Sequence, residues 1–110
     1  MRRLKVDHSE AAEADLENVF RFLQRRGAGR RVASAYVGSM EAACERIGDT
    51  PGMGAAREDL GPGPRSTGFE RRASIVFRVE GERVLIVDVF YGGRDIEGYY
   101  RERGGSAEEG

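Results

Sequence analysis

The sequence predicts an α+β fold in which an antiparallel helical hairpin is followed by a small antiparallel sheet. Two amphipathic helical patterns fill the first half of the chain, separated only by Gly27-Ala28-Gly29. Two strongly apolar runs follow at residues 73–79 and 84–91, joined by Glu80-Gly81-Glu82. Each helix has a single apolar stripe, so the pair needs a further layer to cover it. The sheet supplies that layer.

The first helix begins after Ser9, whose hydroxyl can act as an N-cap. Glu10 and Glu13 place negative charge in its first turn, where the helix dipole favours it. Its apolar positions recur at spacings of three and four, as one face of a helix requires. They are Ala12, Leu16, Val19, Phe20 and Leu23.

The second helix is predicted from about Arg30 to Ile47, and Gly48 ends it. Cys44 lies beside its apolar stripe and is expected to be a small buried hydrophobe. The break between the helices is short, so the two helices are expected to be antiparallel neighbours. The stripe comprises Val32, Tyr36, Met40, Ala43 and Ile47.

A connection rich in glycine, proline and charge occupies residues 49–66, and a short strand is expected at residues 67–70. The run at residues 84–91 is apolar on both faces except at Asp88, as expected for a central strand. Residues 4–6 are compatible with an edge strand.

The C-terminal part of the chain changes character after the last predicted strand. Residues 95–103 are expected to form a short helix, and residues 104–110 a flexible acidic tail. A single domain is therefore predicted over residues 1–103.

Composition argues against several classes of protein. The net charge of −1 argues against avid, non-specific binding of nucleic acid. No run approaches the ~20 apolar residues of a membrane span, and no signal peptide is expected, so we expect a cytoplasmic protein without a membrane partner. Cys44 and His8 are the only cysteine and histidine, so no disulfide, no metal site and no cofactor are predicted.

Taken in order, these segments resemble the RelE/ParE superfamily of toxins from bacterial type II toxin–antitoxin systems, and the ParE branch most closely. The similarity spans about residues 4–103. Pro64 departs from the pattern, because the family usually has an apolar residue before the connection's arginine. The resemblance is carried by Ser9…Ala14-Asp15-Leu16, the helix pair around the glycine break, Pro51…Gly54…Arg57…Leu60…Gly63-Pro64-Arg65, Ile75-Val76-Phe77-Arg78-Val79 and Val89-Phe90-Tyr91-Gly92-Gly93-Arg94-Asp95.

The resemblance implies a β-α-α-β-β-β order, with the hairpin across one face of a twisted antiparallel sheet. It implies a growth-inhibiting toxin that is neutralised by direct binding of a cognate antitoxin. That antitoxin would be ParD-like, of the ribbon-helix-helix type, and would carry any contact with operator DNA within a hetero-oligomer. The target implied by the ParE branch is DNA gyrase, which is inhibited without catalysis.

The alternative is the RelE branch, whose members cleave messenger RNA on the ribosome. Cleavage by the 2′-hydroxyl needs a base, cations for the developing negative charge and an acid for the leaving oxygen. By resemblance, Arg94 and Tyr100 fall on a catalytic arginine and a C-terminal tyrosine of that branch, and Arg65 lies in the connection that delivers another basic group. No lysine or histidine follows His8, and nothing in the sequence singles out Glu70 or Glu97 as a base. The sequence favours a toxin that is not an enzyme, with a non-toxic partner-binding relative as a third possibility.

The partner is expected to contact the outward side of the two helices near Phe22, Leu23 and Tyr36, and the sheet edge. Arg65 and Arg94 are further candidates for contact with the target or partner. Each candidate also has a structural interpretation. Arg65 can bind backbone carbonyls, Arg94 can form a local ion pair with the next residue, and Tyr100 can pack on the sheet.

Overall fold

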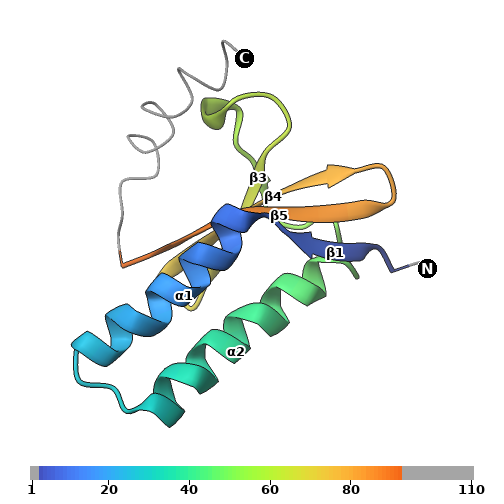
Figure 1. Cartoon of the computed structure of the whole chain (residues 1–110). Helices are drawn as coiled ribbons and strands as arrows, with labels where there is room; N and C mark the ends of the chain where they lie inside the picture. The colour runs from blue at the N-terminus through green and yellow to red at the C-terminus, as the bar shows by residue number, and fades with distance from the viewer. Residues whose placement is uncertain (1–2, 93–110) are drawn as a thin grey trace.

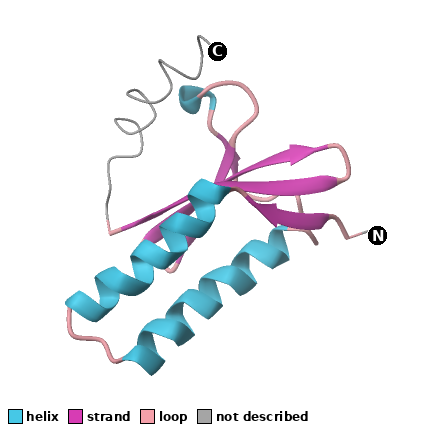
Figure 2. Cartoon of the chain, in the orientation of Figure 1, coloured by secondary structure: helices cyan, strands magenta, loops and turns pink. Residues whose placement is uncertain are grey.

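The computed structural model describes residues 3–92 and shows a helical hairpin lying across one face of a five-stranded sheet (Figures 1 and 2). The α+β class and the hairpin are confirmed. The helix expected at residues 95–103 and the tail at residues 104–110 lie outside the described residues. The elements are β1 (Lys5–His8), α1 (Glu10–Arg25), α2 (Arg30–Ile47), β2 (Ala55–Ala56), a 3₁₀ turn (Glu58–Leu60), β3 (Arg65–Phe69), β4 (Ala73–Glu80) and β5 (Arg83–Tyr91).

The sheet is mixed, with the strand order β1-β5-β4-β3-β2. The expected antiparallel pairing holds from β2 to β5, but β1 runs parallel to β5, with Val6 opposite Val84. The direction of β1 depends on how the helical hairpin crosses the sheet, and no local pattern in the first residues encodes that. Neither helix in this part of the chain is both long and apolar enough to cross a lipid bilayer.

The start of α1 also covers part of the edge of β5. The Ser9 hydroxyl accepts a hydrogen bond from the Ala12 amide at 2.9 Å, as predicted for an N-cap, and donates one to the Val87 carbonyl at 2.7 Å. The Asp15 carboxylate accepts a hydrogen bond from the Val89 amide at 2.9 Å. The side chains of Ser9 and Asp15 therefore replace β1 along the edge of β5 beyond His8.

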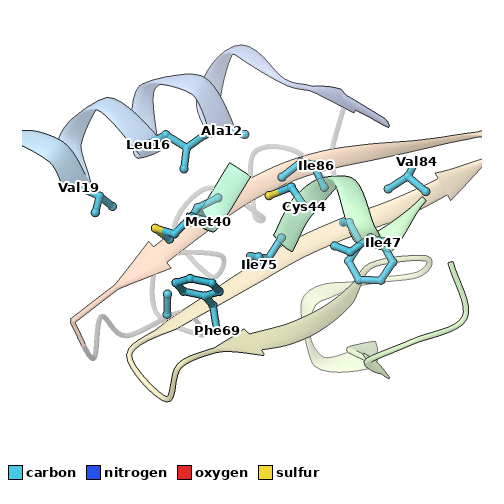
Figure 3. Packing of buried hydrophobic residues seen from close by; sticks show 13 residues of the cluster. Ala12, Leu16, Val19, Met40, Cys44, Ile47, Phe69, Ile75, Val84 and Ile86 are labelled. Carbon is cyan, nitrogen blue, oxygen red and sulfur yellow. The ribbon is translucent and has the colours of Figure 1, made fainter. Parts of the chain in front are cut away.

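The main core lies between the hairpin and the sheet (Figure 3). Of the stripe predicted for α1, Ala12, Leu16 and Val19 are buried, and Phe20 and Leu23 are partly buried. Cys44 is fully buried, as expected. The stripe predicted for α2 is wrong at its start, because Val32 is 63% exposed while Ala33 is fully buried. Val32 falls off the helical face that Ala33 and Met40 direct at the sheet. The largest fully buried side chains of this core are Phe77, Met40, Ile47, Ile75 and Ile86.

A smaller apolar cluster covers the other face of the sheet. Leu60 of the 3₁₀ turn packs there with Val76 and Phe90. Asp88 is only 1% exposed, and a β-bulge in which Asp88 lies opposite Val76 leaves Val87 as the extra residue of β5. β5 is thus covered on both faces, as its apolar sequence predicts.

Candidate functional site

Arg65, a candidate for contact with a target or partner, is the first residue of β3 and holds the preceding loop. Its Nη2 donates to the Gly52 carbonyl at 2.8 Å and to the Gly54 carbonyl at 3.3 Å, and its Nε donates to the Met53 carbonyl at 3.3 Å. A guanidinium has five N–H donors in a fixed plane, so one side chain can bind several carbonyls. Arg65 therefore ties the loop at residues 52–54 to the sheet.

A second arginine of the same connection, Arg57, was part of the family resemblance but not among the predicted site residues. Its guanidinium binds both carboxylate oxygens of Asp59, at 2.9 and 2.7 Å, and contacts the Ser66 hydroxyl at 3.3 Å. These hydrogen bonds hold the pKa of Asp59 below its usual range. The local Arg-x-Asp spacing is the signal that could have indicated this pair.

Four aromatic rings meet where the helical hairpin turns. Tyr36 contacts Phe69 and Tyr91 edge-on, with ring centroids 5.5 and 5.6 Å apart, and Phe22 contacts Tyr91 at 5.6 Å. Edge-to-face pairs at these separations are favourable. Burial, with Tyr91 and Glu70 acting in the same direction, raises the pKa of Tyr36 to about 12.

The three predicted anchor residues all lie near this cluster, but they do not form an outward side of the helices. Tyr36 and Leu23 are partly buried against the main core. Phe22 faces Tyr91 of the sheet, and Arg26 covers its ring at 5.6 Å. The apolar side chains face the sheet because the sheet is the layer that covers the hairpin.

Six exposed arginines surround the same end of the molecule, and we call them the arginine rim. They come from the end of α1, the start of α2 and the β3–β4 turn, which contacts between the helices and the strand ends bring together. None of the six forms a salt bridge within residues 3–92. In the same part of the chain Arg46 and Arg65 also lack one, whereas the remaining arginines pair with carboxylates, namely Arg3, Arg21, Arg57, Arg78 and Arg83. Three Arg-Arg doublets were the sequence signal for this rim: Arg25-Arg26, Arg30-Arg31 and Arg71-Arg72.

The β3–β4 turn within this rim has an unusual backbone. Glu70 and Arg71 have φ values of 52° and 61°, in the left-handed region that glycine and asparagine favour. The Arg72 amide closes the turn onto the Phe69 carbonyl at 3.1 Å.

Two of the predicted site residues, Arg94 and Tyr100, lie outside the described residues. Pro64, the departure from the family pattern, is buried, and its carbonyl accepts a hydrogen bond from the Arg57 amide at 2.9 Å. Proline is tolerated there because the carbonyl, not an amide, makes the bond.

Known toxins are similar to this chain in sequence. A family model described as the ParE toxin of the type II toxin-antitoxin system parDE matches residues 6–96. Toxin ParE3 of Caulobacter vibrioides is 31% identical over 88 residues, which cover 80% of this chain and 86% of that toxin. Toxin ParE1 of the same organism is 34% identical over 86 residues, covering 76% of this chain and 83% of that toxin.

Solved structures share the fold. A chromosomal ParDE system from P. aeruginosa contains a chain that is similar with a TM-score of 0.70 and 23% identity, covering 82% of this chain and 97% of that one. The toxin–antitoxin complex RelBE2 from Mycobacterium tuberculosis contains a chain similar with a TM-score of 0.58 and 19% identity, covering 86% and 97%. With the family match over residues 6–96, the chain belongs to the ParE toxin family of type II toxin–antitoxin systems.

Proposed function

We propose that this toxin acts by inhibiting DNA gyrase and is kept silent by a cognate antitoxin. The observation that carries the proposal is the family match, which extends over nearly all of the described residues. The toxin would act in the bacterial cytoplasm, where gyrase works.

The distribution of possible bases supports inhibition without catalysis. Lys5 and His8 are the only lysine and histidine of the chain, and both lie on β1. Arg65 donates to three backbone carbonyls, so its guanidinium is already engaged. RNA cleavage needs a base close to its cations. Neither Lys5 nor His8 lies on the strand that carries Arg65.

The antitoxin is proposed from the systems in which similar toxins occur, since both solved structures come from toxin–antitoxin systems. We propose a ParD-like, ribbon-helix-helix antitoxin that contacts operator DNA itself. On the toxin, Phe22, Leu23 and Tyr36 mark the end of the hairpin where we place the partner. Arg65 and Arg94 remain proposed contacts with target or partner.

The test is a supercoiling assay with purified gyrase and an excess of purified toxin. We expect supercoiling to be blocked and cleaved gyrase–DNA complexes to accumulate, and prior mixing with the antitoxin should restore supercoiling. Normal supercoiling at toxin excess would refute the gyrase target.

A translated message assayed in parallel separates the alternatives. Cleavage that is lost in Arg94→Ala or Tyr100→Phe would indicate a ribosome-dependent endonuclease instead. If expression without the antitoxin leaves bacterial growth unchanged, the chain is a partner-binding relative without toxicity.

A further inference from the structure

We propose that the arginine rim contacts the phosphate backbone of the DNA that gyrase holds, so that the toxin binds the gyrase–DNA complex through DNA as well as through protein. The inference rests on the proposed function, because it names a further contact at the target proposed there. It assigns that contact to one end of the molecule and to a ligand of one chemistry, the phosphodiester.

The rim concentrates positive charge at one end of the molecule. Its six arginines are all exposed and come from residues 25–31 and 71–72. Glu70 is the only acidic residue in residues 24–32 and 69–73. The net charge of the whole chain is −1, so the rim is a local excess of positive charge. Arginines clustered on one face are the electrostatic signature of a surface that binds a phosphate backbone.

A series of contacts holds the two arginine segments at the same end, where α1 lies along the end of β5 (Figure 1). Arg26 lies over the ring of Phe22, 5.6 Å from its centroid, and that ring meets Tyr91 edge-on at 5.6 Å. The next residue, Gly92, donates to the Arg72 carbonyl at 2.9 Å. The end of the helical hairpin and the β3–β4 turn therefore belong to one region of the surface.

The arginine rim has no ionic partner in the part of the chain that the structure describes, as shown above. Like charges gathered on a surface repel one another, and this repulsion disfavours the compact state. Solvent and salt screen it only in part over short distances. A negatively charged partner would offset the repulsion, and the polyanion with the highest charge density near gyrase is DNA.

The start of α2 favours phosphate as the group that is bound. Its N-cap, Gly29, makes no side-chain hydrogen bond, and its first turn has no acidic residue. The first amide groups of a helix have no partner inside the helix. Helix N-termini and arginine side chains are both among the groups that bind DNA phosphates. Arg30 and Arg31, the first two residues of α2, bring two guanidiniums to the same place.

The mode of inhibition supplies a reason for contact with DNA. The proposed function predicts that cleaved gyrase–DNA complexes accumulate. A ligand stabilises one state of its target only by binding that state more tightly than the others. A surface that contacts phosphates would give the toxin such a preference for DNA-bound gyrase. Phosphates carry no sequence information directly, so the contact would not restrict the toxin to particular DNA sequences.

The rim is expected to act together with a protein contact on gyrase. Phosphate contacts alone give non-specific dissociation constants of about 10⁻⁴–10⁻⁶ M at physiological salt. Two weak contacts made by one molecule bind much more tightly than either contact alone. An antitoxin bound at this end of the hairpin would cover the rim and exclude the DNA.

The test compares two charge reversals on one helix. Arg31 is the second residue of α2 and belongs to the rim, whereas Arg46 lies in the last turn of α2. Both side chains are exposed, and Arg31→Glu and Arg46→Glu change the net charge equally. An anion in the first turn of a helix is favourable, so weaker binding by Arg31→Glu would not come from a weaker helix. Thermal unfolding checks this.

Fluorescence anisotropy of a short labelled DNA duplex, measured over a series of salt concentrations, gives the affinity and its salt dependence. We expect Arg31→Glu to weaken duplex binding roughly tenfold and to reduce the slope of log affinity against log salt by about 1, because a phosphate contact is lost. Arg46→Glu should behave like the unmodified toxin. In the supercoiling assay, Arg31→Glu should need roughly tenfold more toxin to trap cleaved DNA.

Equal inhibition of gyrase by the two variants would overturn the inference, whether or not their duplex affinities differ, and would leave the proposed function intact. Normal supercoiling at an excess of the unmodified toxin would instead refute the gyrase target. Weaker antitoxin binding by Arg31→Glu, with duplex binding and gyrase inhibition unchanged, would overturn the inference in favour of an acidic protein segment.

Discussion

The two ends of the helical hairpin are built differently. At the docked end, where α2 finishes against β1, the Leu4 amide donates to the Gly48 carbonyl at 2.9 Å. Arg3 pairs there with Glu45 at 3.1 Å and with Asp49 at 3.2 Å. At the turn end, where the hairpin reverses, the arginine rim has no carboxylate partner in residues 3–92 and α2 begins without a side-chain cap.

The difference separates an end held together by contacts within the chain from the end of the hairpin where we propose that the partner binds. The docked end joins β1 to α2 through a backbone hydrogen bond and through the ion pairs of Arg3. At the turn end, α2 begins without a side-chain cap or an acidic first turn, and the β3–β4 turn has two non-glycine residues with left-handed backbones. None of these features stabilises the fold. We therefore expect substitutions at the docked end to destabilise the protein, and conventional residues at the turn end to stabilise it at the expense of binding.

The largest effect is expected for Gly48→Ala at the docked end. A Cβ atom there would lie 2.5 Å from the Leu4 carbonyl oxygen and 2.9 Å from Val6 Cγ2, so β1 would have to shift. We expect a loss of roughly 1–3 kcal/mol in the free energy of unfolding, as for other overpacked sites. Urea unfolding measures it.

Gly38 provides the control on the same helix. It lies inside α2, and a Cβ there would meet no atom within 4 Å. Gly38→Ala should therefore raise stability by about 1 kcal/mol, the difference in helix propensity. Similar destabilisation by both alanines would show that the docking of β1 is not what Gly48 provides.

The buried thiol near the docked end predicts a response to alkaline pH. Burial raises the pKa of Cys44 from 9.0 to about 12, with Glu41 and Glu45 acting in the same direction. Between these values the unfolded chain loses the proton while the folded protein keeps it. Stability from this group is therefore complete below about pH 9 and falls as pH rises, by at most about 1.4 kcal/mol per pH unit.

Unfolding midpoints measured between pH 8 and pH 10.5 check this prediction. Cys44→Ala removes the thiol and should show a shallower decline over the same interval. Parallel declines in the two proteins would mean that the thiol ionises equally in the folded and unfolded states.

Much of the fold could be predicted because its determinants are local. The Ser9 cap, the α1 stripe and the apolar run of β5 follow from neighbouring residues. The parallel direction of β1 and the exposure of Val32 depend on how distant elements pack, which a local pattern does not contain. The site was harder still. Arg65 could be named from the connection, but its carbonyl partners depend on how the loop folds back, and the arginine rim exists only because the hairpin and a strand turn meet.

A substitution that relieves the backbone strain of the β3–β4 turn would test whether the turn end is less stable than the docked end. The β4–β5 turn already has a glycine, Gly81, at a φ of 63°, whereas Glu70 and Arg71 have left-handed backbones without being glycine. The double substitution Glu70→Asn/Arg71→Gly should stabilise the protein by about 1 kcal/mol, because asparagine and glycine adopt a left-handed backbone at lower cost than glutamate and arginine.

Thermal unfolding gives the stability, and fluorescence anisotropy gives the DNA affinity of the same protein. The substitution also removes one arginine from the rim, so affinity should fall as stability rises. A loss of stability would show that contacts of Glu70 or Arg71 outweigh the backbone strain.

The smallest effect is expected at the start of α2. There, stability of the helix favours an anion at the first residue, whereas binding of an anionic partner favours a cation. Arg30 is the first residue of α2, as Glu10 is of α1. Arg30→Glu replaces a cation with an anion at the positive end of the helix dipole, which should stabilise the fold by about 0.3–1 kcal/mol at low salt. Glu10→Arg makes the opposite change in α1 and should destabilise it by a similar amount. If the rim binds DNA phosphates, Arg30→Glu is also the variant that gains stability while losing DNA affinity, whereas Glu10→Arg loses stability and keeps its affinity. If Arg30→Glu raised both the stability and the DNA affinity, a cation at this position would not contribute to binding. The cationic first turn of α2 would then need an explanation that does not involve a partner.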